Sequence, residues 1–297
     1  MLLFLLIFLV IRNSDERLEC GRILTSVHFA LEGAGDWKAP WVVSMGIYEE
    51  GEYKVKCTGS LVTPDIIVTA AHCLRQFHGQ WVVRAGVKDR SAKGAIEASL
   101  NRISIHPDYS SPLMYYDVGV ALLNESLPLS DSISTLCLPD SPYDVTTMDN
   151  YGVTVQGWGL TDEGGAGQNL TEIEVTIRSR AECNYKYRRV DSYTKKKRIP
   201  KLVTEAMFCA NNNINDDVGT CYGDSGGPVI RRHWDREEGA DVFTLVGVVS
   251  GNPAGCIRNT LLFPDLYTFI GNSKVKQLMT KWAKISISST HTLTLSK

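Results

Sequence analysis

The chain has 297 residues, 43% of them hydrophobic and 22% charged, which is typical of a folded globular protein and excludes a disordered one. Its formal net charge of −2 argues against nucleic acid or an anionic membrane surface as the main partner. Residues 1–11 (MLLFLLIFLVI) form an apolar run too short to span a bilayer comfortably, and a polar stretch follows. We interpret residues 1–19 as a secretion signal with a short pro-segment. An uncleaved anchor is the alternative, because the run lacks a basic start and a small-residue cleavage pattern.

Further along the chain, short runs of β-forming residues are separated by Gly, Pro, Asn and Asp, and they predict an all-β fold. The clearest runs are 41–45, 66–68, 152–156 and 245–249. This periodicity does not distinguish a sandwich from a barrel. A helix is predicted over 273–284, where Val275, Leu278, Met279 and Trp282 recur at helical spacing. The Ser/Thr-rich residues 285–297 are predicted to be a tail without a core role.

Eight cysteines in a chain with a secretion signal indicate disulfides. A zinc site is not expected, because no Cys-x-x-Cys pair with matching partners occurs, and we predict no metal and no cofactor. The sequence alone does not pair the cysteines.

Residues 178–201 contain ten Lys or Arg against two acids. We expect a solvated surface loop there, with a docking site for a polyanion or an acidic substrate segment as the alternative.

Three segments contain residue types that can build a hydrolytic site. Residues 223–228 read GDSGGP, residues 69–73 read TAAHC, and residues 116–123 read YDVGVALL. A serine hydroxyl is a weak nucleophile that needs a neighbouring base, and an acid can orient that base. Each of His72, Asp117 and Ser225 alone could be structural, as a core histidine, a turn acid and a turn serine. Together they predict a catalytic triad in the order His, Asp, Ser.

These three motifs resemble those of the chymotrypsin/trypsin family of serine endopeptidases, and the resemblance extends over residues 20–282. It implies two packed six-stranded antiparallel barrels with a C-terminal helix and an active site between the barrels. It also implies that the amides of Gly223 and Ser225 bind the oxyanion of the transition state. The implied disulfides are Cys20–Cys137, Cys57–Cys73, Cys183–Cys209 and Cys221–Cys256. The protease domain would span residues 20–284.

The predicted substrate pocket departs from that of the best-known members of the family. Gly219 stands where trypsin has an aspartate at the pocket floor, and Asp265 stands where glycine is usual on the pocket wall. A buried carboxylate there would pair with a basic substrate residue or be satisfied by local donors. Ser250 and Asn252 would line the substrate strand and the pocket mouth, and Asn252 would narrow the entry.

The resemblance also implies a zymogen. Cleavage after Arg22 would free the amino group of Ile23, which would pair with Asp224 beside the nucleophile. The usual Ile-Val-Gly-Gly start is absent here, because the new terminus would read ILTS. Two glycosylation sequons begin at Asn124 and Asn169 and predict exposed loops in a secreted chain.

The sequence thus predicts a secreted, extracellular serine endopeptidase. Its expected partners are protein or peptide substrates, an activating protease and a protein inhibitor, with no nucleic acid and no membrane once the signal is removed. The alternative is a catalytically weak or inactive homologue that acts by binding.

Overall fold

The computed structural model describes residues 20–23, 39–75, 80–111, 113–159, 167–194, 203–215, 218–236, 239–252, 256 and 260–282, with the side chains of 190–194 excepted. The predicted leader (1–19) and tail (285–297) lie outside these residues. No helix within the described ranges is long and apolar enough to cross a membrane.

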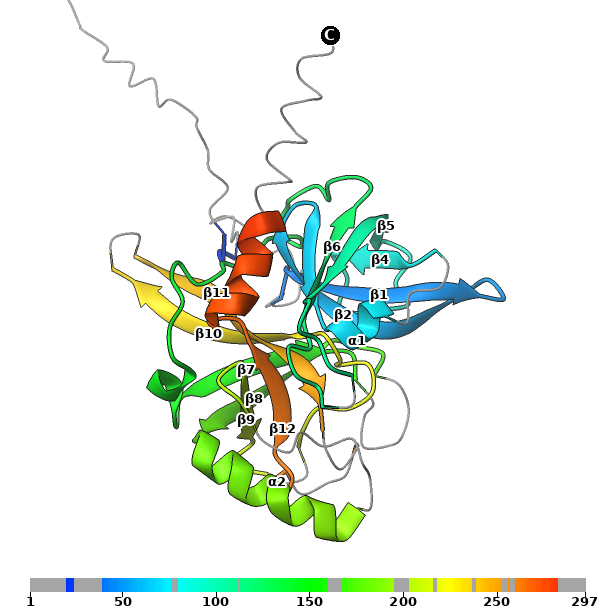
Figure 1. The fold of residues 1–297 in the computed structure, drawn as a ribbon. Helices are drawn as coiled ribbons and strands as arrows, with labels where there is room; N and C mark the ends of the chain where they lie inside the picture. Colours follow the sequence, from blue (N-terminus) through cyan, green and yellow to red (C-terminus); the bar gives the residue numbers. More distant parts are fainter. Residues whose placement is uncertain are drawn as a thin grey trace, which may run out of the picture.

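Two closed barrels of six antiparallel strands form the molecule, as predicted (Figure 1). The first barrel has the strand order β1-β2-β3-β6-β5-β4. Its strands are β1 (Val42–Glu49), β2 (Glu52–Thr63), β3 (Ile66–Thr69), β4 (Val82–Ala85), β5 (Ile96–Ile105) and β6 (Gly119–Leu123). The second barrel has the order β10-β11-β12-β9-β8-β7. Its strands are β7 (Gly152–Gly157), β8 (Thr171–Arg178), β9 (Met207–Asn211), β10 (Pro228–Asp235), β11 (Ala240–Gly251) and β12 (Asp265–Phe269).

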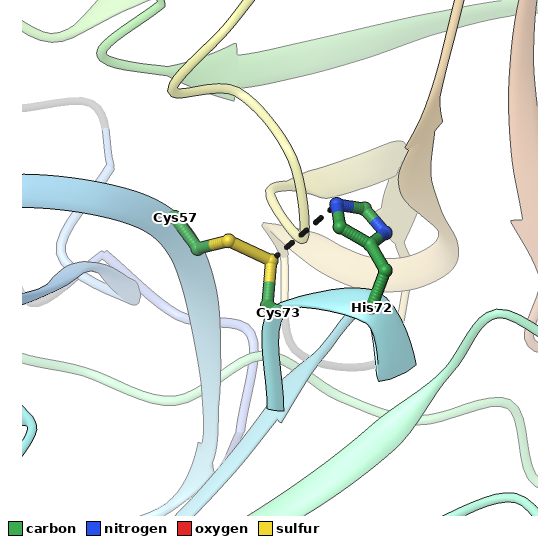
Figure 2. A group of neighbouring side chains, drawn as sticks. All are labelled: Cys57, His72 and Cys73. Carbon is green, nitrogen blue, oxygen red and sulfur yellow. Dashed lines mark hydrogen bonds between the residues drawn. A yellow bond between two sulfur atoms is a disulfide. The ribbon is translucent and has the colours of Figure 1, made fainter. Parts of the chain in front are cut away.

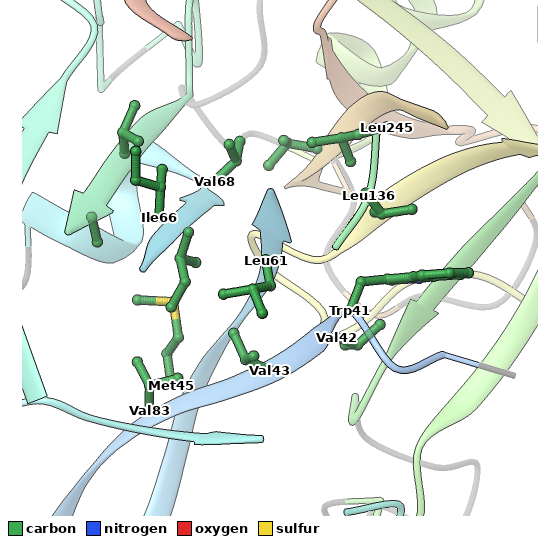
Figure 3. Packing of buried hydrophobic residues seen from close by; sticks show 14 of the residues in the cluster. Trp41, Val42, Val43, Met45, Leu61, Ile66, Val68, Val83, Leu136 and Leu245 are labelled. Atoms are coloured by element: carbon green, nitrogen blue, oxygen red, sulfur yellow. The ribbon is translucent and has the colours of Figure 1, made fainter. Parts of the chain in front are cut away.

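Apolar side chains fill the first barrel because β-strands direct alternate residues inward. Val43, Met45, Leu61, Ile66 and Val83 are all almost completely buried and meet inside it (Figure 3). A second cluster, which includes Val155, Phe208 and Phe269, fills the other barrel. The first cluster also contains Ile230, Leu245 and Val248 of the second barrel, so apolar contacts hold the two barrels together.

The C-terminal helix covers 273–282 of the described residues and is drawn in red in Figure 1. Its buried residues belong to the same apolar cluster as the first barrel; they are Val275, Leu278, Met279 and Trp282. The predicted helix is therefore confirmed up to residue 282, and residues 283–284 lie outside the described residues.

The basic stretch 178–201 is not a loop in its first part, which corrects the prediction. Helix α2 spans Arg180–Thr194 and is fixed by the Cys183–Cys209 disulfide and by Tyr187, whose hydroxyl donates to Pro264 O at 2.7 Å. Only a thin stripe of this helix is buried, so the sequence showed little helical periodicity. Lys195–Lys197 and Arg198 lie outside the described residues.

Candidate active site

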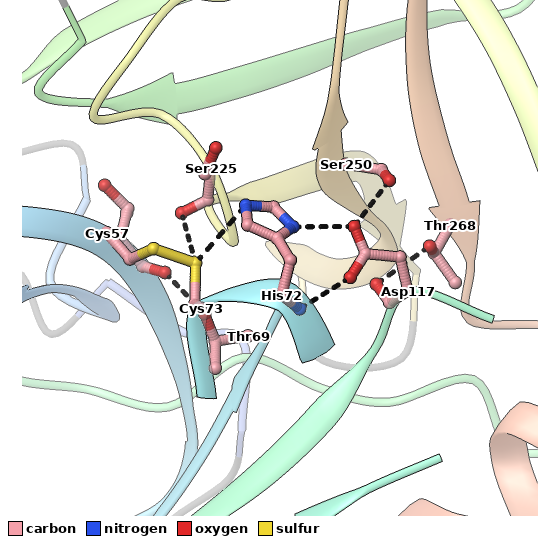
Figure 4. A network of polar contacts seen from close by, with 9 residues as sticks. Cys57, Thr69, His72, Cys73, Asp117, Ser225, Ser250 and Thr268 are labelled. Atoms are coloured by element: carbon pink, nitrogen blue, oxygen red, sulfur yellow. Dashed lines mark hydrogen bonds and ion pairs between the residues drawn. A yellow bond between two sulfur atoms is a disulfide. The ribbon is translucent and has the colours of Figure 1, made fainter. Parts of the chain in front are cut away.

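The predicted base and acid lie at the ends of two paired strands of the first barrel. β3 leads into α1 (Ala71–Arg75), which carries His72, and Asp117 precedes β6, the partner of β3. The carboxylate of Asp117 accepts the His72 backbone amide at Oδ1, at 2.8 Å, and ring Nδ1 lies 2.7 Å from Oδ2 (Figure 4). Because a carboxylate only accepts, Nδ1 carries the proton, and Nε2 of the neutral ring is left to accept one.

Asp117 is fully buried and its oxygens are satisfied by several donors. Ser250 Oγ donates to Asp117 Oδ2 at 2.6 Å, and Thr268 Oγ1 donates to the Asp117 backbone carbonyl at 2.9 Å. Such donors offset the cost of burying a charge. The hydroxyl of Ser250 therefore points at the acid, and pairing of the Ser250 backbone with a substrate stays a prediction.

The environment of His72 favours its protonated form. Burial by itself lowers the pKa of the imidazole, but the charge of Asp117 and the hydrogen bond to it outweigh burial, and the pKa of His72 lies above its ordinary value. An imidazolium formed during a reaction would therefore be stabilised by Asp117.

Ser225 lies next to this pair, in the loop that precedes β10. No hydrogen bond joins Ser225 Oγ to His72 Nε2 in the described part of the chain, and Nε2 lies 3.7 Å from Cys73 Sγ (Figure 4). Catalytic hydrogen bonds are often long in substrate-free enzymes and tighten only in the complex. The structure thus brings Ser225 to the His72–Asp117 pair without closing the last bond.

His72, Cys57 and Cys73 form the one cluster of metal-ligand residue types within the described ranges (Figure 2). Their candidate ligand atoms lie within 4.8 Å of one another. The two sulfurs are bonded to each other, so neither is a thiolate that could hold a metal. The cluster is the disulfide that ties α1 to β2.

The amides predicted to bind an oxyanion are available. Neighbouring amides of the loop are used: Asp224 N donates to Cys221 O at 3.0 Å, and Gly226 N donates to Val249 O at 2.8 Å. The amides of Gly223 and Ser225 donate no hydrogen bond within the described residues. Gly223 has φ of +105°, a conformation that favours glycine.

Asp224, the predicted partner of an activated N-terminus, is held by backbone amides in this uncut chain. Its carboxylate accepts Gly159 N at 2.7 Å and Cys221 N at 3.0 Å. Burial raises the pKa of Asp224 to about 6. A Cβ on Gly159 would collide with the carboxylate, so this turn requires glycine.

The predicted activation bond, Arg22–Ile23, lies on the surface of the barrels near β10 and β11. Ser134 Oγ donates to Arg22 O at 2.9 Å, and the Arg22 guanidinium lies 3.9 Å from Asp235 Oδ2. Ile23 packs against the apolar cluster of the first barrel. The disulfide of Cys20 anchors this segment.

The predicted pocket residues Gly219 and Asp265 are neighbours. A Cβ on Gly219 would lie 3.0 Å from Asp265 Oδ2. Asp265 is fully buried; Oδ2 accepts Thr220 N at 2.6 Å, and Oδ1 accepts Asn252 Nδ2 at 2.6 Å. Burial raises the pKa of Asp265 to about 6. In the free chain, then, local donors satisfy the carboxylate, and the Asn252 side chain points at Asp265.

All four disulfides pair as the resemblance implied: Cys20–Cys137, Cys57–Cys73, Cys183–Cys209 and Cys221–Cys256.

The asparagines of both predicted glycosylation sequons are exposed. Asn124 Oδ1 accepts Ser99 N at 2.9 Å, and Asn169 forms an isolated bridge with Asp89.

Sequence reasoning missed several residues that support the site. Thr268 holds the backbone of Asp117, and Thr220 supplies an amide to Asp265. Thr58 contacts the loop of Ser225, donating its amide to Ser225 O at 2.8 Å. None of these threonines belongs to a motif with a chemical role, so no sequence signal identified them.

The comparisons with known proteins agree with this geometry. The Trypsin family model matches residues 32–274. The clotting factor G beta subunit of Tachypleus tridentatus is 29% identical over 235 residues, which cover 77% of this chain and 71% of that protein. Ovochymase of Halocynthia roretzi is 34% identical over 240 residues, which cover 79% of this chain but only 14% of that longer protein.

The fold also has a solved counterpart in neuropsin, a serine protease expressed in the limbic system of mouse brain. The two structures superpose with a TM-score of 0.62 at 24% identity, over 84% of this chain and 95% of that one. With the family match across most of its length, the chain belongs to the trypsin family of serine endopeptidases.

Proposed function

We propose that this chain is a secreted serine endopeptidase that hydrolyses peptide bonds with His72, Asp117 and Ser225. The observation that carries the proposal is the pair of half-buried His72 and buried Asp117, with Nδ1 2.7 Å from the carboxylate. The pair lies beside a serine loop in which two amides donate no hydrogen bond within the described residues. Four disulfides support secretion, because such bonds persist in oxidising compartments.

In this mechanism Ser225 Oγ attacks the substrate carbonyl carbon while His72 Nε2 takes the hydroxyl proton. The carbonyl oxygen becomes an oxyanion that accepts hydrogen bonds from the amides of Gly223 and Ser225. His72 then gives its proton to the leaving amine, and the C–N bond breaks. Water attacks the resulting ester, with His72 again as base, and Ser225 is regenerated.

Activation by cleavage after Arg22 is the next part of the proposal. The new ammonium group of Ile23 would pair with Asp224, whose buried carboxylate has backbone amides but no cation among its partners within the described residues. A positive charge beside it would offset the burial that raises the pKa of Asp224 to about 6. An activating protease has to displace the contact between Ser134 and Arg22.

The pocket favours a basic residue before the scissile bond. Asp265 offers a carboxylate beside Gly219, and the buried methyl group of Thr260 lies against the same glycine. The hydroxyl of Thr220 is buried beside this carboxylate, and its oxygen can accept a hydrogen bond from a substrate cation. Asn252 has to yield its hydrogen bond to Asp265 when such a residue enters.

The proposal is tested with an organophosphonate probe on the chain cleaved after Arg22. Ser225 should be labelled, and Ser225→Ala, which removes the nucleophile but little volume, should remain folded and unlabelled. His72→Ala is the matched control, since it keeps the nucleophile but loses the base and should label far more slowly. Labelling of Ser225→Ala at the wild-type rate would refute the assignment.

A catalytically weak homologue that acts by binding is the second candidate. One observation favours it: Nε2 of His72 contacts Cys73 Sγ and makes no hydrogen bond to Ser225 Oγ within the described residues. A cleaved, folded chain that never labels would establish this alternative.

A further inference from the structure

We propose that Thr58 is a positioning residue that holds the two oxyanion-binding residues in place, an inference that rests on the endopeptidase function proposed above. Thr58 Oγ1 donates to Gly223 O at 2.7 Å, and Thr58 N donates to Ser225 O at 2.8 Å. One residue of the first barrel thus contacts both residues whose amides would bind the oxyanion. Thr58 and Gly223 are 165 residues apart in the sequence.

Thr58 is well suited to impose a position because it is rigid. It is fully buried in β2, where it pairs with Ser44 of β1. The preceding residue, Cys57, is bonded to Cys73 of α1, next to the catalytic histidine. The remaining polar group of Thr58, its carbonyl, accepts the hydroxyl of Thr69 at 2.8 Å. Every polar group of Thr58 therefore has a partner.

Gly223, in contrast, has no side chain to hold it, although Cys221 and Asp224 near it are anchored by a disulfide and by the buried Asp224 carboxylate. As a glycine at φ +105° it has access to conformations that other residues lack. The preceding Tyr222 is 70% exposed, and its amide faces the weak acceptor Cys256 Sγ at 3.3 Å. Within the described residues, the Thr58 hydroxyl is the hydrogen-bond donor to Gly223 O.

Anchoring the Gly223 carbonyl fixes the plane of the Gly223–Asp224 peptide and the Cα from which the Gly223 amide projects. An oxyanion donor stabilises the transition state only when it is aimed in advance at the developing charge. Loss of the Thr58 hydroxyl should therefore weaken transition-state binding and leave ground-state binding of substrate largely unchanged.

The test compares Thr58→Val with Thr58→Ser in the activated chain. Valine keeps the branched shape and the backbone amide but removes the hydroxyl, whereas serine keeps the hydroxyl. Removing an oxyanion donor outright costs about 10²–10³ in kcat, so misplacing one in Thr58→Val should cost roughly tenfold, with KM changed less than about twofold. Thr58→Ser should stay within about threefold of wild type. Thr63→Val is the matched control, because Thr63 lies on the same strand but donates to Asp65.

A second readout separates positioning from folding. A peptide boronic acid forms a tetrahedral adduct on the serine, so its affinity should fall in Thr58→Val by the same factor as kcat, while thermal unfolding of Thr58→Val and Thr63→Val should be similar. Wild-type kcat in Thr58→Val, a rise in KM alone, or a Thr58→Ser variant as impaired as Thr58→Val would each overturn the proposal.

If the probe does not label the wild-type chain and the chain cleaves no peptide, the proposed function fails. Crystal structures of wild type and Thr58→Val then decide whether Thr58 positions Gly223. A Gly223 carbonyl that turns away in the valine variant supports it. A carbonyl that stays in place refutes it.

Discussion

Replacement of Asp265 by asparagine tests how the pocket chooses its substrate. In the free chain the carboxylate accepts Thr220 N and Asn252 Nδ2, both at 2.6 Å. An arginine or lysine side chain that enters the pocket would replace the Asn252 amide with a cation. Asparagine at 265 keeps the volume of the side chain but removes the charge that makes this exchange favourable.

The size of the effect follows from this exchange. A hydrogen bond to a charged group contributes about 1.5–3 kcal/mol, and one between two charged groups lies at the upper end of this range. The Asn252 amide already bonds to the carboxylate, so a substrate cation that displaces it gains at most the width of the range, about 0.5–1.5 kcal/mol. Asp265→Asn should therefore lower kcat/KM for basic substrates about two- to tenfold, at ~1.4 kcal/mol for each factor of ten.

The assay measures kcat/KM for two peptides that differ only in the residue before the scissile bond, Arg in one and Leu in the other. The ratio of the two constants should fall in Asp265→Asn, with the Leu peptide unchanged. Asn252→Gly should raise the same ratio, because it removes the competing amide. The reasoning is refuted if both peptides lose activity together in Asp265→Asn, or if the wild-type enzyme prefers Leu.

Three further outcomes are expected. Arg22→Gln should leave the chain uncut and inactive; N-terminal sequencing of active material that finds a start other than Ile23, or activity in the variant, would contradict the proposed activation. The double variant His72→Ala/Ser225→Ala should be no slower than either single variant by more than a few-fold, since the residues act as a unit, and additive losses in kcat would argue against a triad. Burial raises the pKa of Asp265 from 3.8 to about 6, so this group stabilises the fold most below pH 4, and that stability is lost as pH rises through 6. Relative to wild type, Asp265→Asn should therefore gain about 2 kcal/mol of unfolding free energy between pH 4 and pH 7; denaturant titrations that give a constant difference would refute this.

Much of the fold was predictable because it depends on local patterns. The runs at 41–45, 66–68, 152–156 and 245–249 all lie wholly or mainly in strands. The C-terminal helix followed from its 3.6-residue spacing. Helix α2 was missed because its few buried residues, such as Cys183 and Tyr187, are held by a disulfide and a single hydrogen bond rather than by a continuous apolar stripe.

The sequence by itself determined which residue types are present for chemistry. The motifs around His72, Asp117 and Ser225 were recognisable because a hydrolytic site needs those groups in fixed local contexts. The tertiary structure alone decided the partners of each group. It directed Ser250 at Asp117 and bonded Asn252 to Asp265.

The physical reason is that a motif is local, whereas a tertiary contact joins segments that are far apart in the sequence. A motif records what one stretch of backbone needs, such as a glycine at positive φ at position 223. A hydrogen bond between Thr58 and Gly223 requires two distant segments to meet within 2.7 Å, and that distance depends on the closure and packing of both barrels. No local pattern in the chain encodes such a distance, so only the folded structure assigns Thr58 to the site.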